Sequence, residues 1–201
     1  MPRVQYAARE IVCKVVYYGP ARSGKTTNLQ WVHRSLPEPR RTELVSLATA
    51  NDRTLFFDFL PLDLGTISGF RTKFQLYTVP GQVYYDRTRT LVLQGADGVV
   101  FVADSAPDRA RENLESLRNL QANLLDNDLD IRSLPLVFQY NKQDLDDARS
   151  PASLDEALNF RDVPAHAAVA VRGEGVVPTL RAVSELVLRS VSRELAAPVE
   201  H

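Results

Sequence analysis

Residues 19 to 26 read Gly-Pro-Ala-Arg-Ser-Gly-Lys-Thr, with two glycines, a lysine and a hydroxyl residue at the spacing of a phosphate-binding loop. Gly24 permits close approach of the backbone to a phosphate, Lys25 supplies a point charge for the β- and γ-phosphates, and the Thr26 hydroxyl can bind Mg²⁺. The loop leads into a helical pattern whose positive end would face the phosphates. The pattern predicts nucleotide binding, although kinases, ATPases and GTPases all use it.

The expected phosphate contacts come from this loop and from one glycine further along the chain. They are Gly19, Ala21, Arg22, Ser23, Gly24, Lys25, Thr26, Thr27 and Gly81. Ala21 brings a methyl group beside the γ-phosphate, where it can crowd the groups that act in the transition state while leaving nucleotide binding intact. Binding and hydrolysis are therefore separate predictions for this chain.

A base-reading site is predicted at residues 141–144, Asn-Lys-Gln-Asp, which directly follow a short apolar run. Asp144 can accept the adjacent N1–H and 2-amino donors of guanine, whereas adenine lacks that pair and would leave the carboxylate unpaired. Asn141 can brace the neighbouring loop, and the stem of Lys142 can lie over the purine. We also expect the backbone N–H of Ala170 to reach the guanine carbonyl oxygen.

The stretch Thr-Val-Pro-Gly-Gln at residues 78–82 predicts the part of the site that responds to the γ-phosphate. The amide of Gln82 can donate and accept at once, so it is the candidate to orient an attacking water. Thr54 is the candidate to close on Mg²⁺ when GTP is present. Thr78 stands where nucleotide switches usually carry an aspartate near the metal. We expect Asp58, an acidic residue in an apolar run, to supply that carboxylate from the neighbouring strand, with the Thr78 hydroxyl beside it.

The order of these three motifs resembles that of the Ras-like small GTPases over nearly the whole chain. The runs at residues 16–20, 24–29, 53–62 and 76–82 are similar to those of the bacterial MglA proteins, GTPases that set cell polarity in gliding bacteria. The resemblance implies a switch that binds GTP and GDP with Mg²⁺, controls polarity or motility through effectors of its GTP form, and works with an activating Roadblock-domain protein like MglB. It further implies that Arg53 is an arginine finger supplied in cis, which with Gln82 and Lys25 would carry slow, partner-stimulated hydrolysis.

Two other functions remain open at this point. A nucleotide-bound scaffold with negligible hydrolysis would account for Ala21 and Thr78. A P-loop nucleoside or metabolite kinase is the weaker alternative, because the sequence has no obvious lid and a kinase leaves residues 141–144 unexplained.

The elements that must position these residues alternate between short apolar runs and helical patterns. The runs are residues 11–17, 74–79, 99–103, 136–140 and 167–171. Each is too short for a buried helix and too uniformly apolar for a strand with one wet face, so we predict a mostly parallel, doubly wound α/β sheet with helices on both faces.

Two helices are predicted from their apolar spacing. A helix over residues 109–126 would bury Leu114, Leu117, Leu124 and Leu125, and a C-terminal helix opened by Pro178 would bury Leu180, Val183, Val187 and Val191. Residues 48–70 break the alternation. We interpret them as a loop, an extra antiparallel strand at the sheet edge over residues 55–60, and a turn that contains Pro61, Gly65 and Gly69.

Composition sets the remaining expectations. The net charge of -1, from 24 basic and 25 acidic residues, gives no case for nucleic acid or an anionic membrane as the main partner. No membrane-spanning run or lipidation motif occurs, and the single cysteine, Cys13, lies in an apolar run where we expect a buried thiol. We expect one GTP-binding domain over residues 1–201 with a disordered tail at 196–201, in the cytoplasm and recruited to cell poles through partners.

Overall fold

The computed structural model describes residues 3–5, 8–36, 44–47, 57–67, 69–81 and 85–196. Its strands are β1 (Arg3–Gln5), β2 (Glu10–Tyr18), β3 (Val45–Leu47), β4 (Phe57–Ile67), β5 (Phe70–Thr78), β6 (Gly98–Asp104), β7 (Leu136–Asn141) and β8 (Ala165–Ala168). Its helices are α1 (Lys25–Ser35), α2 (Asp86–Leu93), α3 (Ala110–Leu125), α4 (Pro151–Leu158) and α5 (Val176–Ala196), with a 3₁₀ turn at Pro107–Arg109.

The strands form one eight-stranded sheet in the order β3-β4-β5-β2-β6-β7-β8, and β1 pairs with β2. The pairs that join β5, β2, β6, β7 and β8 are parallel, whereas the β1–β2, β3–β4 and β4–β5 pairs are antiparallel. β2 has β5 along one side, and along the other β1 pairs with its beginning and β6 with its end. The predicted fold class is confirmed.

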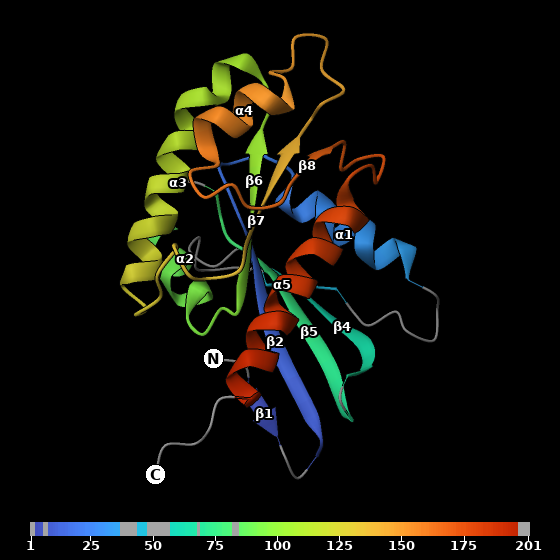
Figure 1. Ribbon diagram of the computed structural model, residues 1–201. Helices are drawn as coiled ribbons and strands as arrows, with labels where there is room; N and C mark the ends of the chain where they lie inside the picture. The colour runs from blue at the N-terminus through green and yellow to red at the C-terminus, as the bar shows by residue number, and fades with distance from the viewer. Residues whose placement is uncertain are drawn as a thin grey trace.

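Both faces of the sheet are covered by helices, α1 and α5 on one and α2, α3 and α4 on the other (Figure 1). The alternation of β2 shows how one strand serves both cores. Cys13, Val15 and Tyr17 pack with α1 and α5, while Val16 and Tyr18 pack with α2 and α3, and none of the five is exposed. A strand buried on both faces has no polar face to alternate, which is why the runs in the sequence are uniformly apolar.

The antiparallel part of the sheet is larger than the sequence predicts. β4 extends to Ile67 and passes through Pro61 and Gly65, so the turn before β5 lies further along the chain, where Gly69 has a φ of 82°. β4 is also not the edge, because β3 pairs with its first three residues. On its other side β4 pairs with β5, where Pro61 lies opposite Gln75.

Two further expectations are corrected by burial and pairing. On α3, Leu120 and Leu124 are buried and Leu117 is partly so, but Leu114 is 39% and Leu125 59% exposed, because the inward stripe is centred on buried polar residues. The last strand is β8 (Ala165–Ala168), and residues 169–171 form a turn after it instead of its continuation.

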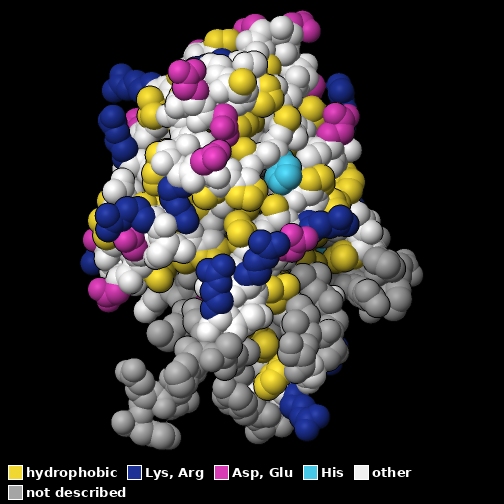
Figure 2. Space-filling model, viewed as in Figure 1, with side chains coloured by type: hydrophobic (Ala, Val, Ile, Leu, Met, Phe, Trp, Pro, Cys, Tyr) yellow, Lys and Arg dark blue, Asp and Glu magenta, His cyan; other side chains and the backbone are white. Residues whose placement is uncertain are grey.

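α5 follows its predicted pattern, with Val183, Val187 and Val191 buried and Leu180 packed against the same core. The buried thiol of Cys13 is also confirmed. Among the described residues no helix is both long and apolar enough to cross a membrane. Basic and acidic side chains are interspersed over the described part of the face in Figure 2.

The connections that follow β2, β5, β6, β7 and β8 all begin at the carboxyl edge of the parallel strands. They start at residues 19, 79, 105, 142 and 169. Ligands of open α/β sheets bind at this edge, so the fold gathers the predicted motifs there.

Candidate functional site

The loop between β2 and α1 turns on two glycines that the surrounding structure requires. Gly19 has a φ of 145° and Gly24 a φ of 101°, values that favour glycine. A Cβ on Gly19 would lie 2.2 Å from the carbonyl oxygen of Val102, and one on Gly24 would lie 2.1 Å from the Nδ2 atom of Asn141. The close packing of the loop against β6 and β7 therefore excludes side chains at both positions.

Lys25 begins α1 with its side chain folded into the loop. Its Nζ atom donates hydrogen bonds to the carbonyl oxygens of Gly19 at 2.9 Å and Pro20 at 2.6 Å. Burial and, after it, the charge of Arg89 lower the pKa of Lys25 to about 7, against the opposing effect of Asp58. The ammonium group is therefore enclosed where a phosphate would restore its charge.

Asp58 on β4 lies beside Thr78 on the adjacent strand β5, and its carboxylate reaches the first turn of α1. The Thr26 hydroxyl donates to Asp58 Oδ2 at 2.5 Å, and the Thr78 hydroxyl donates to the same oxygen at 3.0 Å. The Asp58 N–H in turn donates to the Thr78 hydroxyl at 2.9 Å. The expected juxtaposition of these three residues is thus present, and hydroxyl and carboxylate oxygens are the ligands that Mg²⁺ prefers.

Asn141, buried at the end of β7, ties together three loops of the carboxyl edge. Its Nδ2 atom donates to the carbonyl oxygen of Ser23 at 2.7 Å, and its Oδ1 atom accepts from the N–H of Ala170 at 2.9 Å. One side chain therefore joins the phosphate loop, the 141–144 segment and the turn after β8.

The Ala170 N–H is thus already engaged by Asn141. A guanine carbonyl at this position would have to share the N–H with Asn141 or displace it. The predicted guanine contact of Ala170 stays a prediction.

Lys142 and Asp144, which follow Asn141, carry opposite charges and are the residues expected to contact the guanine base. Lys142 has a φ of 70°, and its Nζ atom lies 2.6 Å from the Oδ2 atom of Asp104, which is 1% exposed. The Asp144 carboxylate is partly exposed and lies 3.9 Å from the guanidinium of Arg172. Lys142 is thereby fixed to the end of β6, while Asp144 stays accessible at the rim.

Other residues of the phosphate loop lie as follows. Arg22 is exposed with a φ of 63°, and Thr27 is half-buried. The Ser23 hydroxyl is buried and has no hydrogen-bond partner within the described part of the chain. A Cβ built on Gly81 would lie 2.4 Å from both the N and Cα atoms of Ala21, so Gly81 and the loop are in close contact.

Three predicted residues, Arg53, Thr54 and Gln82, lie outside the described residues. Gly81, which precedes Gln82 in the sequence, is described, and it lies against Ala21 of the phosphate loop.

Two residues that sequence reasoning missed also reach this edge, Asp104 at the end of β6 and Arg109 before α3. The Arg109 Nη2 atom donates to the carbonyl oxygen of Ala21 at 3.0 Å. The sequence did carry a signal for each. Asp104 is an acidic residue at the end of an apolar run, and Arg109 is a basic residue at the start of a helix, where the helix dipole disfavours it.

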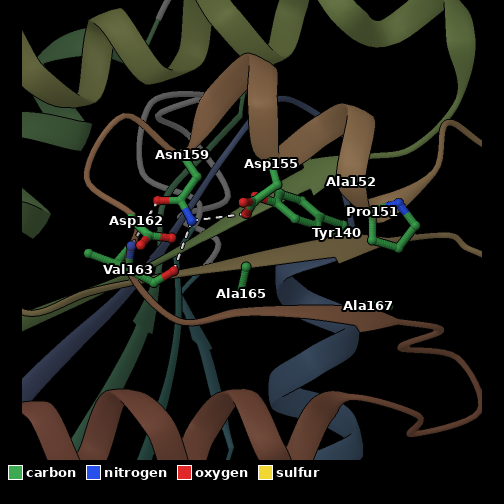
Figure 3. A pocket seen from close by; sticks show the side chains of 9 residues that line it. All are labelled: Tyr140, Pro151, Ala152, Asp155, Asn159, Asp162, Val163, Ala165 and Ala167. Carbon is green, nitrogen blue, oxygen red and sulfur yellow. Dashed lines mark hydrogen bonds between the residues drawn. The ribbon is translucent and has the colours of Figure 1, made fainter.

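Away from the phosphate loop, a hollow of about 370 Å³ lies between α4 and strands β7 and β8 (Figure 3). Its polar groups bond to one another, because Asp155 Oδ1 accepts from the Tyr140 hydroxyl at 2.7 Å and from Asn159 at 2.9 Å. Asn159 also donates to the carbonyl oxygen of Val163. These bonds fasten α4 to the sheet, and the hollow shares no residue with the phosphate loop.

Comparisons with known proteins agree with the geometry. The sequence model of the ADP-ribosylation factor family matches residues 54–187. The chain is 52% identical over 193 residues to the mutual gliding-motility protein MglA of Myxococcus xanthus, covering 96% of this chain and 99% of that protein. It is 31% identical to ADP-ribosylation factor-like protein 6 of Danio rerio over 132 residues, which cover 60% of this chain and 68% of that protein. The same-named protein of Caenorhabditis briggsae is 27% identical, with 85% of this chain and 84% of that protein covered.

Proposed function

This chain belongs to the ADP-ribosylation factor family and is a small GTPase, a GTP-binding switch, and we propose that it hydrolyses GTP to GDP and phosphate and exchanges partners between the two states. Small GTPases of this family bind GTP and GDP with Mg²⁺. We propose that residues 1–201 form one such domain. The observation that carries the proposal is a pair of hydrogen bonds at Asn141, which donates to the carbonyl oxygen of Ser23 and accepts from the N–H of Ala170, and so holds the phosphate loop beside the 141–144 segment.

Guanine would be selected by the partly exposed carboxylate of Asp144, which can accept two adjacent donors of that base. The Lys142 stem would cover one face of the purine, supported by its bond to the buried Asp104. Asn141 would act by bracing the phosphate loop. Ala170 would contribute its N–H only by sharing it with Asn141.

The phosphates would occupy the loop at residues 19–27. Lys25 would exchange its two carbonyl partners for phosphate oxygens, a change favoured because burial holds its pKa low in their absence. The buried Ser23 hydroxyl, which lacks a partner among the described residues, supports an acceptor entering the loop. Backbone groups of Gly19, Gly24 and Gly81 would line the remaining surface.

The oxygen set around α1 fits magnesium. Thr26 and Thr54 would bind the ion directly, and Asp58 and Thr78 would orient the ligands around it from the neighbouring strands. When bound, Mg²⁺ neutralises charge that develops on the transferring phosphate.

Hydrolysis would rest on Gln82 orienting the water and on Arg53 neutralising charge, with Lys25 on the γ-phosphate. The contact between Gly81 and Ala21 supports this assignment, because it leads the chain toward the γ-phosphate end of the loop just before Gln82. The same contact is made with the backbone of Ala21, whose methyl group would lie beside the γ-phosphate. This crowding supports a second candidate function, a nucleotide-bound scaffold that hydrolyses GTP negligibly.

The cellular role and the partner are proposed from the relative. The name of that relative, MglA of Myxococcus xanthus, concerns gliding motility, and its 52% identity to this chain over almost its whole length supports a motility or polarity switch here. We propose that regulation comes from a Roadblock-domain activating protein like MglB, that effectors bind the GTP state, and that such partners bring the chain to the cell poles.

One experiment separates the switch from the scaffold. Phosphate release from GTP is measured for the wild type, Gln82→Ala and Arg53→Ala, each alone and with a Roadblock-domain protein. The switch requires release above background that the partner accelerates, with each substitution lowering the accelerated rate by about 10²-fold or more. Tight GTP binding without release under any condition would establish the scaffold instead.

A further inference from the structure

Arg109 joins three groups at the side of the phosphate loop that faces α3. Its Nη2 atom donates to the carbonyl oxygen of Ala21 at 3.0 Å, and its Nη1 atom donates to Glu112 at 3.0 Å. Its Nε atom lies 3.9 Å from Oδ2 of Asp104. The planar fork of a guanidinium can hold several acceptors in fixed directions, which a lysine ammonium cannot do.

Asp104 connects Arg109 to the guanine-reading segment. The same Oδ2 atom accepts from Lys142 Nζ at 2.6 Å, so one buried carboxylate lies between two cations. The backbone of Asp104 is itself fixed, because Asn113 accepts from its N–H at 2.9 Å and donates to its carbonyl oxygen at 2.8 Å. Any displacement of Lys142 or Arg109 therefore acts on a carboxylate that has little freedom to follow.

The backbone that Arg109 holds is strained. Arg22, immediately after Ala21, has a φ of 63° without being glycine. In a planar trans peptide the carbonyl and the following N–H point in opposite directions. The bond from Arg109 to the Ala21 carbonyl therefore turns the Arg22 N–H away from α3 and holds the strained peptide in place. Gly81 touches Ala21 as well, so two segments meet at this residue.

We propose that Arg109 is a positioning residue that fixes the tip of the phosphate loop at Ala21 and couples it through Asp104 to Lys142, so that nucleotide retention depends on it. The inference rests on the proposed guanine site. The proposed chain of contacts joins the base end of the site to the γ-phosphate end, and it consists only of protein groups.

The test measures release of a fluorescent GDP analogue from the full chain with excess GDP as chase. Arg109→Ala should release it about 10-fold faster, the loss of one charge-assisted hydrogen bond that is partly exposed. Arg109→Lys keeps the charge but not the fork and should fall between wild type and Arg109→Ala. Arg111→Ala, at an exposed arginine two residues further on, is the control and should match the wild type.

A double-mutant cycle with Lys142→Ala distinguishes coupling from a general loss of stability. If the two residues act through Asp104, the double variant releases GDP more slowly than the product of the single effects predicts. Two results would overturn the inference while leaving the proposed function intact. One is a double variant whose fold-change in GDP release equals the product of the two single fold-changes, and the other is release by Arg109→Ala within twofold of the wild type. A wild type that retains no GDP would instead refute the guanine site. Should Arg109→Ala fail to fold, Arg109→Lys takes its place in the cycle.

Discussion

At the residue scale, the contact between Asp58 and Thr78 was predictable and the contact between Arg109 and the phosphate loop was not. An acidic residue inside an apolar run needs a polar partner, and adjacency of the two strands supplied Thr78, as the structure shows. Arg109 donates to the backbone carbonyl oxygen of Ala21, 88 residues away. Every residue has such a carbonyl, so the residue types in the sequence could not indicate this partner. Residue patterns therefore predicted which side chains need partners more reliably than which backbone groups receive them.

Gly81→Ala tests the contact between the segment before Gln82 and the phosphate loop. The added Cβ would lie 2.4 Å from backbone atoms of Ala21, so the two segments must separate. We expect GTP turnover to fall at least about 10-fold as the neighbouring glutamine shifts, with GDP affinity changed much less. Gly95→Ala is a matched control, because Gly95 has a φ of 68° and open space around it. It should cost about 1 kcal/mol of stability and leave turnover unchanged. Equal turnover for both variants would contradict the proposal.

At the element scale, the five parallel strands, β2, β5, β6, β7 and β8, were predicted from their apolar runs, but β1 and β3 were not. Each has three residues, too few for a periodicity to be recognised. The length of β4 was missed because Pro61 and Gly65 normally indicate a turn. Here Pro61 pairs with Gln75, and Gly65 falls in an irregularity between Asp63 and Thr66, after which the pairing with β5 resumes. Exposure of Leu114 on α3 was missed because polar residues, including Asn113 and Asn123, occupy the inward stripe.

Tyr140→Phe tests how α4 is held on the sheet. The substitution removes the hydroxyl that donates to Asp155, and Asn159 remains as that carboxylate's other partner (Figure 3). The free energy of unfolding should fall by about 1 kcal/mol, measured by urea denaturation. GDP affinity should not change, because the hollow lies apart from the phosphate loop. A loss of affinity as large as the loss of stability would mean that α4 supports the nucleotide site.

His166 on β8 should make the stability of the fold sensitive to acid. Burial lowers its pKa below the ordinary value of 6.5, and its Nε2 atom is buried with no hydrogen-bond partner among the residues that the structure describes. As the pH falls through about 6.5, the unfolded chain takes up a proton on this histidine before the folded chain does, so stability is lost. Wild type should therefore lose more unfolding free energy than His166→Gln between about pH 7.5 and about pH 5.5. Parallel losses in the two proteins would contradict this.

At the scale of the whole molecule, guanine nucleotide should stabilise the fold and adenine nucleotide should not. A ligand at 100 times its Kd adds about 2.7 kcal/mol to the stability of the state that binds it. We expect GDP with Mg²⁺ to raise the melting temperature, ADP to leave it unchanged, and Asp144→Ala to abolish the difference. Equal stabilisation by ADP would favour the kinase alternative. The fold class, unlike this selectivity, followed from the order of strands and helices alone.

The position of β2 in the sheet has a consequence for synthesis on the ribosome. Glu10 pairs with Arg71 in β5, and Val15 pairs with Gly98 in β6, so its parallel neighbours are made much later than β2 itself. At about 5–20 residues per second, β2 waits several seconds for β5 and longer for β6. During that time its two apolar faces and most of its hydrogen-bonding edge lack their final partners. The nascent chain is therefore most exposed to aggregation and to chaperone capture before β5 and β6 have been translated.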